Sequence, residues 1–431
     1  MRLHGRWLAH VGAIAVASVM LAACGSSSSG SSSSTSAGAA SSSQTPTNTK
    51  SASSILGTPH KATGTPYVFA MINLSGAPVS FPQSQQGAQA AIEYVNNYED
   101  GINNHPIVLK VCANTTLQAP ASATCANQLI GDNPLLVLGA SDTGGAGSFP
   151  IWQAHNLAYI GGSPFTPVES NAPNAVIFTG YSGPDNVATI KYAAQTLHVK
   201  SVAIIEANDT QGVAVGQAVG ADAKAAGMTT KLVPLSDTAT TSDFAAAAAQ
   251  AESGNPDMIF IEEPNECPQT MLAIQQTGYK GKLAGIGPCA SPPALKAAGS
   301  AANGFIYAEP NVGFDQINTP AWGHEIQLTK AILAKYAPAN IALDANALSP
   351  FGAVMNLHTT LGAIKGKLDE HSILAAFEAG SNHPNWLAHP YTCNRMQVAT
   401  QKAVCQGYQQ IFQVNNGQVR TLSTAWVNGG S

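Results

Sequence analysis

A repeated alternation of short apolar runs and amphipathic stretches constrains the fold of this 431-residue chain more than any other feature. The expected strands of the first series are rich in Val, Ile and Leu and end at Gly, Asn or Pro. They span residues 68–74, 107–112, 135–139 and 158–161, and the expected helices between them span 84–98, 119–130 and 148–156. This order predicts a parallel sheet with helices on both faces.

The same order restarts after residue 200. Here the expected strands span 201–206, 229–235, 258–262 and 283–287, and the expected helices span 211–226, 243–253 and 266–277. Three further helices are expected at 322–336, 345–366 and 372–379, ahead of an apolar run around 409–414 that returns to the second lobe. We therefore expect an α/β protein of two doubly wound parallel-sheet lobes with a crevice between them. The first lobe is assigned 65–181 and 308–390, and the second 182–307 and 391–431.

The N-terminal segment predicts secretion. Two arginines precede an apolar run at residues 8–22 that carries no charged side chain, which is typical of a signal peptide at 1–23. About 15 apolar residues are too few to span a bilayer. Residues 21–24 read Leu-Ala-Ala-Cys, which resembles the lipobox of bacterial lipoproteins and implies cleavage before Cys24 and lipidation of its thiol. The alternative is an ordinary signal with an incidental cysteine.

Residues 24–64 are expected to form the lipidated cysteine and a flexible tether, because Ser, Gly, Ala and Thr dominate up to residue 54. The acyl chains would hold the protein at the outer face of the cell membrane. Of the seven cysteines, six remain once Cys24 is lipidated, which suits disulfides in an oxidising compartment. Six cysteines allow fifteen connectivities, and we favour the three sequence-local pairs. These are Cys112 with Cys125, Cys267 with Cys289, and Cys393 with Cys405.

Composition and missing motifs exclude several classes of protein. Only 10% of residues are charged, the net charge is −5, and no cluster of Lys and Arg is present, so nucleic-acid binding is not expected. No pair of cysteines has the spacing of a zinc knuckle, so no metal is expected. Asp142-Thr143-Gly144 is the triplet of aspartic proteases, but such enzymes need two copies and only one is present. No nucleophile elbow, Walker loop or dinucleotide fingerprint occurs, so we expect neither enzymatic activity nor a cofactor.

A family resemblance rests on ordered segments between about residues 65 and 419. The segments are Asn-Leu-Ser-Gly at 73–76, Gly-Ile-Asn-Asn-His at 101–105, Asn-Pro-Asp-Met-Ile-Phe at 255–260 and Ala-Asn-Gly at 302–304. Their order resembles the solute-binding proteins of ABC importers, in particular the leucine/isoleucine/valine-binding branch with the type I periplasmic-binding-protein fold. This resemblance implies two lobes joined by a multi-strand hinge, which close on a small solute and present it to an ABC permease. We expect a monomer.

The resemblance places the ligand-binding residues of the first lobe at the ends of two strands. The glycine-rich loop at 139–147 suits a carboxylate through hydroxyls and backbone N–H groups, and Phe81 falls where the family covers the ligand side chain with an aromatic ring. The residues concerned are Phe81, Ser141, Thr143, Gly144, Gly145, Ser163 and Thr166. The alternatives are a helix start capped by Asp142 or Thr143, ordinary turn residues at 163 and 166, and a core role for Phe81.

The second lobe departs from the family pattern. Gln211 stands where the family has a cleft tyrosine, and Cys289 occupies the position of the glutamate that usually pairs with a ligand ammonium. Glu262 or Glu263 could replace that glutamate, or both could be solvated loop charges. We therefore expect a small carboxylated solute, a branched-chain amino acid first, with amides, urea-like compounds and aromatic acids open. A sensor that reports to a membrane receptor is the rival function.

Overall fold

The computed structural model describes residues 52–76, 80–116, 118–180, 183–236, 238–263 and 266–430. All of them belong to one compact unit, residues 50–431. The predicted signal peptide and Cys24 lie outside the described residues. None of the described helices is both long and apolar enough to cross a membrane.

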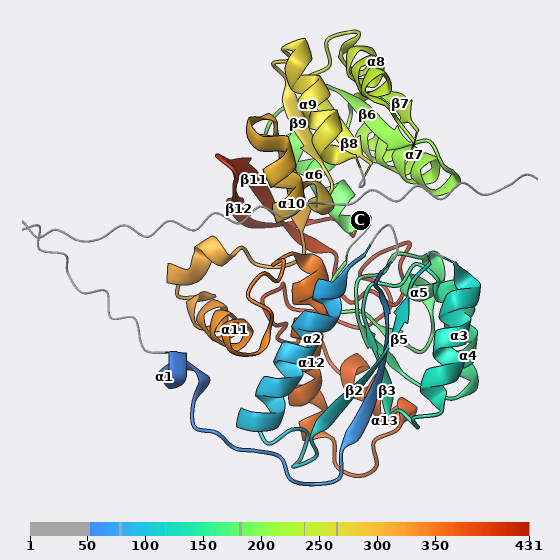
Figure 1. Ribbon diagram of the computed structural model, residues 1–431, viewed down its shortest axis with the longest axis vertical. Coiled ribbons are helices and arrows are strands. Elements are labelled where there is room, and N and C mark those ends of the chain that lie inside the picture. Colours follow the sequence, from blue (N-terminus) through green and yellow to red (C-terminus); the bar gives the residue numbers. More distant parts are fainter. Residues whose placement is uncertain are drawn as a thin grey trace, which may run out of the picture. The chain divides into compact units, whose positions relative to one another are not determined.

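The first lobe is built on a five-stranded parallel sheet in the order β2-β1-β3-β4-β5. Its strands are β1 (Tyr67–Leu74), β2 (Ile107–Asn114), β3 (Leu136–Gly139), β4 (Tyr159–Gly161) and β5 (Ala175–Val176). Helices α2 and α12 lie on one side of the sheet and α3 and α4 on the other (Figure 1). The helices of this lobe are α1 (Ala52–Leu56), α2 (Pro82–Tyr98), α3 (Ala119–Ile130), α4 (Gly145–Ala154), α5 (Pro167–Asn171), α11 (Gly323–Tyr336), α12 (Ala345–Ala363) and α13 (Glu370–Glu378).

The second lobe contains a seven-stranded sheet in the order β12-β11-β10-β9-β8-β6-β7. Strand β11 runs antiparallel to both of its neighbours, β10 and β12, and the remaining pairs of neighbouring strands are parallel. The strands of this lobe are β6 (Ser201–Ala207), β7 (Thr229–Leu235), β8 (Met258–Glu262), β9 (Lys282–Gly285), β10 (Ile306–Glu309), β11 (Tyr408–Asn415) and β12 (Gln418–Asn428). Its helices are α6 (Pro184–Gln195), α7 (Thr210–Ala225), α8 (Thr241–Glu252), α9 (Cys267–Thr277) and α10 (Pro292–Ala298), with 3₁₀ turns η1 (Gly287–Ala290) and η2 (Gly299–Ala302). A third turn, η3 (Phe314–Asn318), follows β10.

The chain passes between the two sheets three times: after β5, after β10 and before β11. The predicted fold class is confirmed, including the return of the last hairpin to the second lobe. Each sheet has its own core, because the largest cluster of buried apolar residues uses only second-lobe elements and two others use first-lobe elements. Phe69 and Phe260 are completely buried in these separate cores.

Two stretches pack differently from the assigned boundaries. Leu56 and Ala62 are buried, and the backbone N–H of Ala62 donates to the carbonyl of Asn96, so the folded body begins before residue 65. Near the other end, Val404 pairs with Ile177 of the first lobe. Ala403 and Cys405 donate backbone hydrogen bonds to Ser170 and Ile177 of the first lobe, whereas Ala399 donates to Gly430 after β12, so residues 391–407 contact both lobes.

The three predicted disulfides are confirmed. Their Cα–Cα distances are 5.5 Å for Cys112–Cys125, 5.3 Å for Cys267–Cys289 and 4.4 Å for Cys393–Cys405, all compatible with a cross-link. One joins β2 to α3, one joins the start of α9 to η1, and one closes the loop ahead of β11.

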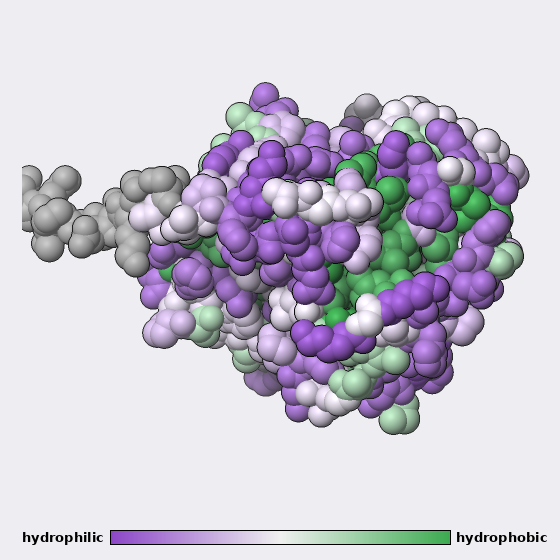
Figure 2. Space-filling view, turned by 90° about the horizontal axis from the view of Figure 1, so that it is seen from below, coloured by the Kyte–Doolittle hydropathy of each residue, from purple (hydrophilic) through white to green (hydrophobic). Residues whose placement is uncertain are grey.

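The view from below in Figure 2 shows an apolar area framed by hydrophilic residues, although only 10% of the chain is charged. Uncharged polar side chains therefore supply much of the hydration.

Candidate functional site

The loops after β3 and β4 lie side by side at the carboxyl edge of the first sheet. Gly139 and Gly161 are register partners at the last positions of these parallel strands, so the residues that follow leave the sheet together. A Cβ atom added at Gly145 would lie 3.0 Å from Oγ1 of Thr166. The structure thus brings the two predicted ligand loops together, as parallel strand order requires.

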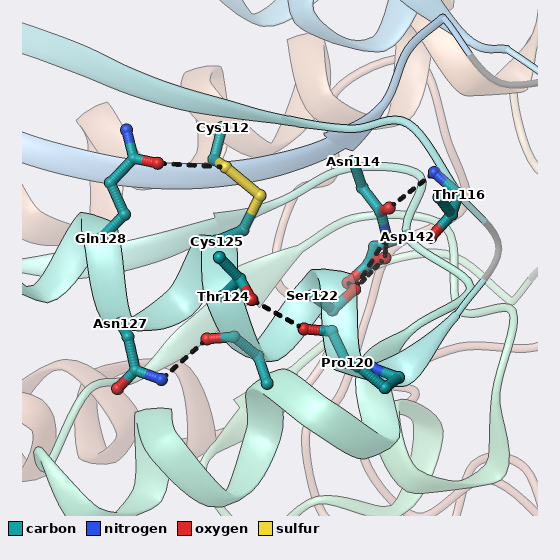
Figure 3. Close-up of a disulfide and its surroundings, with 11 residues drawn as sticks. Cys112, Asn114, Thr116, Pro120, Ser122, Thr124, Cys125, Asn127, Gln128 and Asp142 are labelled. Atoms are coloured by element: carbon teal, nitrogen blue, oxygen red, sulfur yellow. Dashed lines mark hydrogen bonds between the residues drawn. A yellow bond between two sulfur atoms is a disulfide. The ribbon is translucent and has the colours of Figure 1, made fainter.

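Asp142 shapes the loop after β3. Its carboxylate accepts hydrogen bonds from Ser122 Oγ at 2.7 and 2.8 Å and from Asn114 Nδ2 at 3.0 Å (Figure 3). It also accepts from the backbone N–H of Gly144 at 3.0 Å. A Cβ atom at Gly144 would lie 2.0 Å from Ser122 Oγ, so only glycine allows this close approach. One of the two expected backbone donors, Gly144, is therefore engaged by Asp142.

Two hydroxyls at these strand ends have no partner within the described part of the chain. Oγ1 of Thr143 and Oγ of Ser163 are both buried and make no hydrogen bond there. Ser163 is only 1% exposed. A buried hydroxyl without a partner costs free energy, and such atoms commonly mark the place of a bound group. Both can donate to a carboxylate.

Ser141 and Thr166 already have protein partners. Ser141 Oγ lies 2.9 Å from Ser84 Oγ and donates to Asn346 Oδ1 at 3.0 Å, which ties α2, the β3 loop and α12 together. Thr166 is the N-cap of α5, where its hydroxyl accepts from the backbone N–H of Glu169. Hydrogen bonds within the protein therefore account for both side chains, and a ligand contact at either stays a prediction.

Phe81 lies at the start of α2 and stacks on Phe165, with 5.8 Å between ring centroids and an interplanar angle of 20°. Asn73, at the end of β1, donates from Nδ2 to the carbonyl of Phe81 and fixes its backbone. Both rings are partly exposed. The sequence prediction included Phe81 but missed Phe165, although it adjoins the Ser163–Thr166 segment.

The second lobe presents Glu262 and Asn186. Glu262 ends β8, and its Oε2 accepts from Asn186 Nδ2 at 3.2 Å. Asn186 is 4% exposed, and its Oδ1 has no hydrogen-bond partner among the described residues. An amide oxygen accepts only, so the missing partner must be a donor.

The other residues predicted in the second lobe have different surroundings from Glu262. Glu263 is completely buried, and its Oε2 accepts from the backbone N–H of Glu266 inside its own loop. Gln211 is the second residue of α7, and its side chain lies outside the described residues. Cys289 is buried in its disulfide. Glu262 is thus the predicted acidic residue that the structure leaves partly exposed.

A cavity of ≈ 410 Å³ is lined by residues of both lobes. Phe165 and Thr166 contribute to one wall, and Asn186 of α6 and Val215 of α7 to another. The structure therefore brings the β4 loop of the first lobe to the α6–α7 surface of the second. In the ranges given above, no three His, Cys, Asp or Glu side chains are placed to hold a metal ion.

A model of the family described as periplasmic binding protein matches residues 70–415. This chain belongs to the periplasmic binding protein family. No curated protein matches it. A leucine binding protein from Thermotoga maritima is 16% identical with a TM-score of 0.67, and the match covers 84% of this chain and 99% of that one. The fold is the type I fold of ABC substrate-binding proteins.

Two further solved structures were obtained with ligands. A solute binding protein from Rhodopseudomonas palustris in complex with 4-hydroxybenzoate is 16% identical with a TM-score of 0.69, covering 85% of this chain and 98% of that one. One from Rhodopseudomonas palustris BisB5 in complex with 3,4-dihydroxybenzoic acid is 16% identical with a TM-score of 0.65 and the same coverage. At these identities the likeness concerns the fold.

Electrostatics at the strand ends of this periplasmic binding protein favour protonated carboxyls. The side chain of Glu262 keeps some exposed surface, but its carboxyl group is largely shielded from water, and this burial together with the negative charge of Asp185 raises the pKa of Glu262 to about 8. In the first lobe, burial raises the pKa of Glu169 to about 8 even though Tyr159 and the Phe165 backbone donate hydrogen bonds to it. Glu169 thereby holds the segment that carries Phe165 and Thr166.

Stability is expected to fall as pH rises from 5 to 9, and Glu262→Gln is expected to reduce that fall. Between its ordinary pKa of 4.5 and its folded value of about 8, Glu262 binds more protons in the folded than in the unfolded chain. The free energy of unfolding then decreases with pH over this window. Thermal melts at pH 5, 7 and 9 test this prediction. The control is Glu378→Gln, which changes an exposed side chain of α13. Equal slopes for both variants and the parent would contradict it.

Proposed function

We propose that this chain is a membrane-anchored solute-binding lipoprotein that captures a small carboxylated solute between its lobes and delivers it to an ABC permease, without chemical turnover. The observation that carries the proposal is the pair of buried hydroxyls of Thr143 and Ser163, which have no hydrogen-bond partner among the residues that the structure describes. They lie at the carboxyl ends of neighbouring strands, where open α/β sheets bind ligands. Two such donors suit the two oxygens of a carboxylate.

The second lobe supports a ligand with a hydrogen-bond donor at its other end. Asn186 Oδ1 and Glu262 are acceptors, and an ammonium group supplies several donors to such a pair. An amino acid has a carboxylate and an ammonium group on one carbon atom. A branched-chain or related amino acid is therefore the first candidate, with Glu262 in place of the residue lost at Cys289.

An aromatic acid is the second candidate, because a specific feature favours it. The stacked rings of Phe81 and Phe165 stand beside the loop that carries Ser163 and Thr166. A flat ligand ring could pack against them at little conformational cost. The two related proteins in complex with hydroxybenzoates bind ligands of this class. Amides and urea-like compounds lack the carboxylate, so they would form weaker hydrogen bonds with the two hydroxyls.

The mechanism is closure of the lobes around the solute. A ligand that contacts both lobes binds the closed form better, and that difference shifts the population toward closure. The closed form would then be recognised by the permease. A sensor would use the same closure to report to a receptor, and transport of the identified solute by reconstituted permease separates the two functions.

A ligand screen tests the proposal directly. The chain without its signal segment is melted with branched-chain amino acids, other amino acids, hydroxybenzoates, organic acids and amides. A ligand at 100 times its Kd adds about 2.7 kcal/mol of stability, a shift of a few degrees. Calorimetric titration then gives Kd. Stabilisation by carboxylated solutes alone supports the proposal, and stabilisation by amides or sugars alone overturns it.

Cys24→Ala is expected to abolish membrane retention while leaving the fold intact. The prediction follows because the acyl chains would be the anchor and Cys24 their attachment point. Fractionation of cells followed by a melt of the released protein measures both. Ser26→Ala, in the same tether, is the control. Recovery of Cys24→Ala in the membrane pellet after signal cleavage would refute lipid anchoring.

A further inference from the structure

A second cavity, of ≈ 610 Å³, lies between the lobes and shares no lining residue with the first. Its walls come from η1 and α10 of the second lobe and from β11 and β12. The segment after β10 and residues 341–348 ahead of and within α12 close the other side. Because β10 leads into a crossing, this cavity adjoins the hinge.

Three carboxyl groups line the second cavity, and they differ in how they are used. Asp315 accepts from the backbone N–H of Thr421 at 2.9 Å and from its hydroxyl at 2.7 Å. Asp344 accepts from the backbone N–H of Ala347 at 3.1 Å and from Gln83 Nε2 at 3.0 Å. Glu309 accepts from the backbone N–H of Ala345 at the start of α12. A carboxylate has about four acceptor sites, so Glu309 retains capacity.

A buried acceptor beside these carboxyls points independently to a missing donor. Asn311 is 3% exposed and lines the cavity, and its Oδ1 has no hydrogen-bond partner among the described residues. The amide oxygen cannot donate, so a neighbouring carboxylate in its ionised form cannot satisfy it. The nearest cationic side chain in the lining is Lys296, which is exposed on α10.

The rest of the lining is largely apolar. Leu295, Phe314, Leu343, Leu348 and Phe412 contribute to it. Leu343 is 45% exposed, so a ligand that covers its side chain would remove apolar surface from water, which is favourable. An acceptor-rich, negatively charged end and an apolar wall together match a molecule with a cationic head and a hydrocarbon body.

We propose that this cavity is a binding site for an organic ammonium group, with Glu309 and Asn311 as acceptors for its N–H donors and with its alkyl part against the apolar wall. The site goes beyond the proposed solute site, because its residues are different and it could be filled while the solute cleft is empty. A neutral alcohol lacks the charge, and an anion is disfavoured by the ionised forms of Glu309 and Asp344, so the site selects cations.

Charge at Glu309 sets the pH dependence of this site. Burial, with the negative charges of Asp344 and Asp185, raises the pKa of Glu309 to about 8. The charges that act on Glu309 are those of Asp344, the N-cap of α12, and Asp185 of α6, and the other charged groups of the cavity lining are Asp315 of η3 and Lys296 of α10. An ammonium ion favours the ionised form, so binding releases a proton near neutral pH and strengthens from pH 6 to pH 9.

The test uses n-butylammonium, n-butanol and butyrate as probes of equal length, with binding to the full mature chain followed by NMR line broadening and titration. We expect n-butylammonium to bind with a Kd in the millimolar range and the other two not to bind. Glu309→Gln should weaken binding at least tenfold and remove its pH dependence. Asn311→Leu should weaken it to a similar degree.

Two controls make the outcome decisive. Asp315→Asn removes a carboxylate whose two oxygens already accept hydrogen bonds from Thr421, so it should leave the affinity for n-butylammonium within about twofold of the parent. Thr143→Val changes the solute cleft and should also leave it unchanged, so failure of the solute proposal is distinguishable from failure here. Equal binding of all three probes, or equal loss in Glu309→Gln and Asp315→Asn, would overturn the proposal.

Discussion

Thr143→Val is expected to weaken solute binding ten- to hundredfold without lowering the stability of the empty protein. The hydroxyl of Thr143 is buried and has no partner in the described structure, so the empty fold loses no hydrogen bond when it is removed. A charge-assisted hydrogen bond to a carboxylate contributes about 1.5–3 kcal/mol, which corresponds to that change in Kd. Calorimetric titration with the solute found in the screen, and melts of the empty protein, measure the two effects.

The matched contrast is Ser141→Ala, two residues earlier in the same loop. Ser141 already bonds Ser84 and Asn346, so its loss should lower stability by about 1–3 kcal/mol and change affinity less. Ser163→Ala should behave like Thr143→Val, because the hydroxyl of Ser163 is also buried and has no partner in the described part of the chain. Unchanged affinity in both Thr143→Val and Ser163→Ala would mean that the ligand does not contact these strand ends.

The fold could be predicted because apolar periodicity is local. Strand β1 differs from its expected range by one residue at Tyr67, and the three disulfides follow from sequence-local pairing. The ends of elements depend on chemistry that periodicity does not contain. Helix α4 begins at Gly145 rather than at Ser148, because the contact between Asp142 and the Gly144 N–H starts the turn.

The candidate site could be predicted only in part, because hydrogen-bond satisfaction is not visible in a sequence. Ser141 and Thr143 both carry a hydroxyl in the same loop. The hydroxyl of Ser141 bonds Ser84 of α2 and Asn346 of α12, whereas that of Thr143 has no partner among the described residues. Asn186 and Asn311 belong to no recognisable motif, and each was identified by one side-chain oxygen that lacks a partner in the same part of the chain. A sequence signal did exist for Phe165, which stands next to Thr166, but its stacking on Phe81 depends on how α2 and the β4 loop pack.

Removing the Cys267–Cys289 disulfide is expected to lower the stability of the second lobe by about 3 kcal/mol. The two cysteines are 22 residues apart, and closing a loop of this length restricts the unfolded chain by about that amount of free energy. Both are completely buried, so the double variant Cys267→Ala/Cys289→Ala avoids leaving a buried polar group. Urea unfolding under non-reducing conditions measures the loss.

The same variant separates stability from ligand recognition. Cys289 stands where the family pattern has an acidic ligand contact, and here the disulfide fixes η1 at the end of β9 instead. If Glu262 has taken over the acidic role, the double variant should bind solute with an affinity within about threefold of the parent below its unfolding transition. The control, Cys112→Ala/Cys125→Ala, should lose about 3 kcal/mol in the first lobe. A large loss of affinity confined to the Cys267/Cys289 variant would instead show that η1 itself holds the solute, and the role proposed for Glu262 would then be wrong.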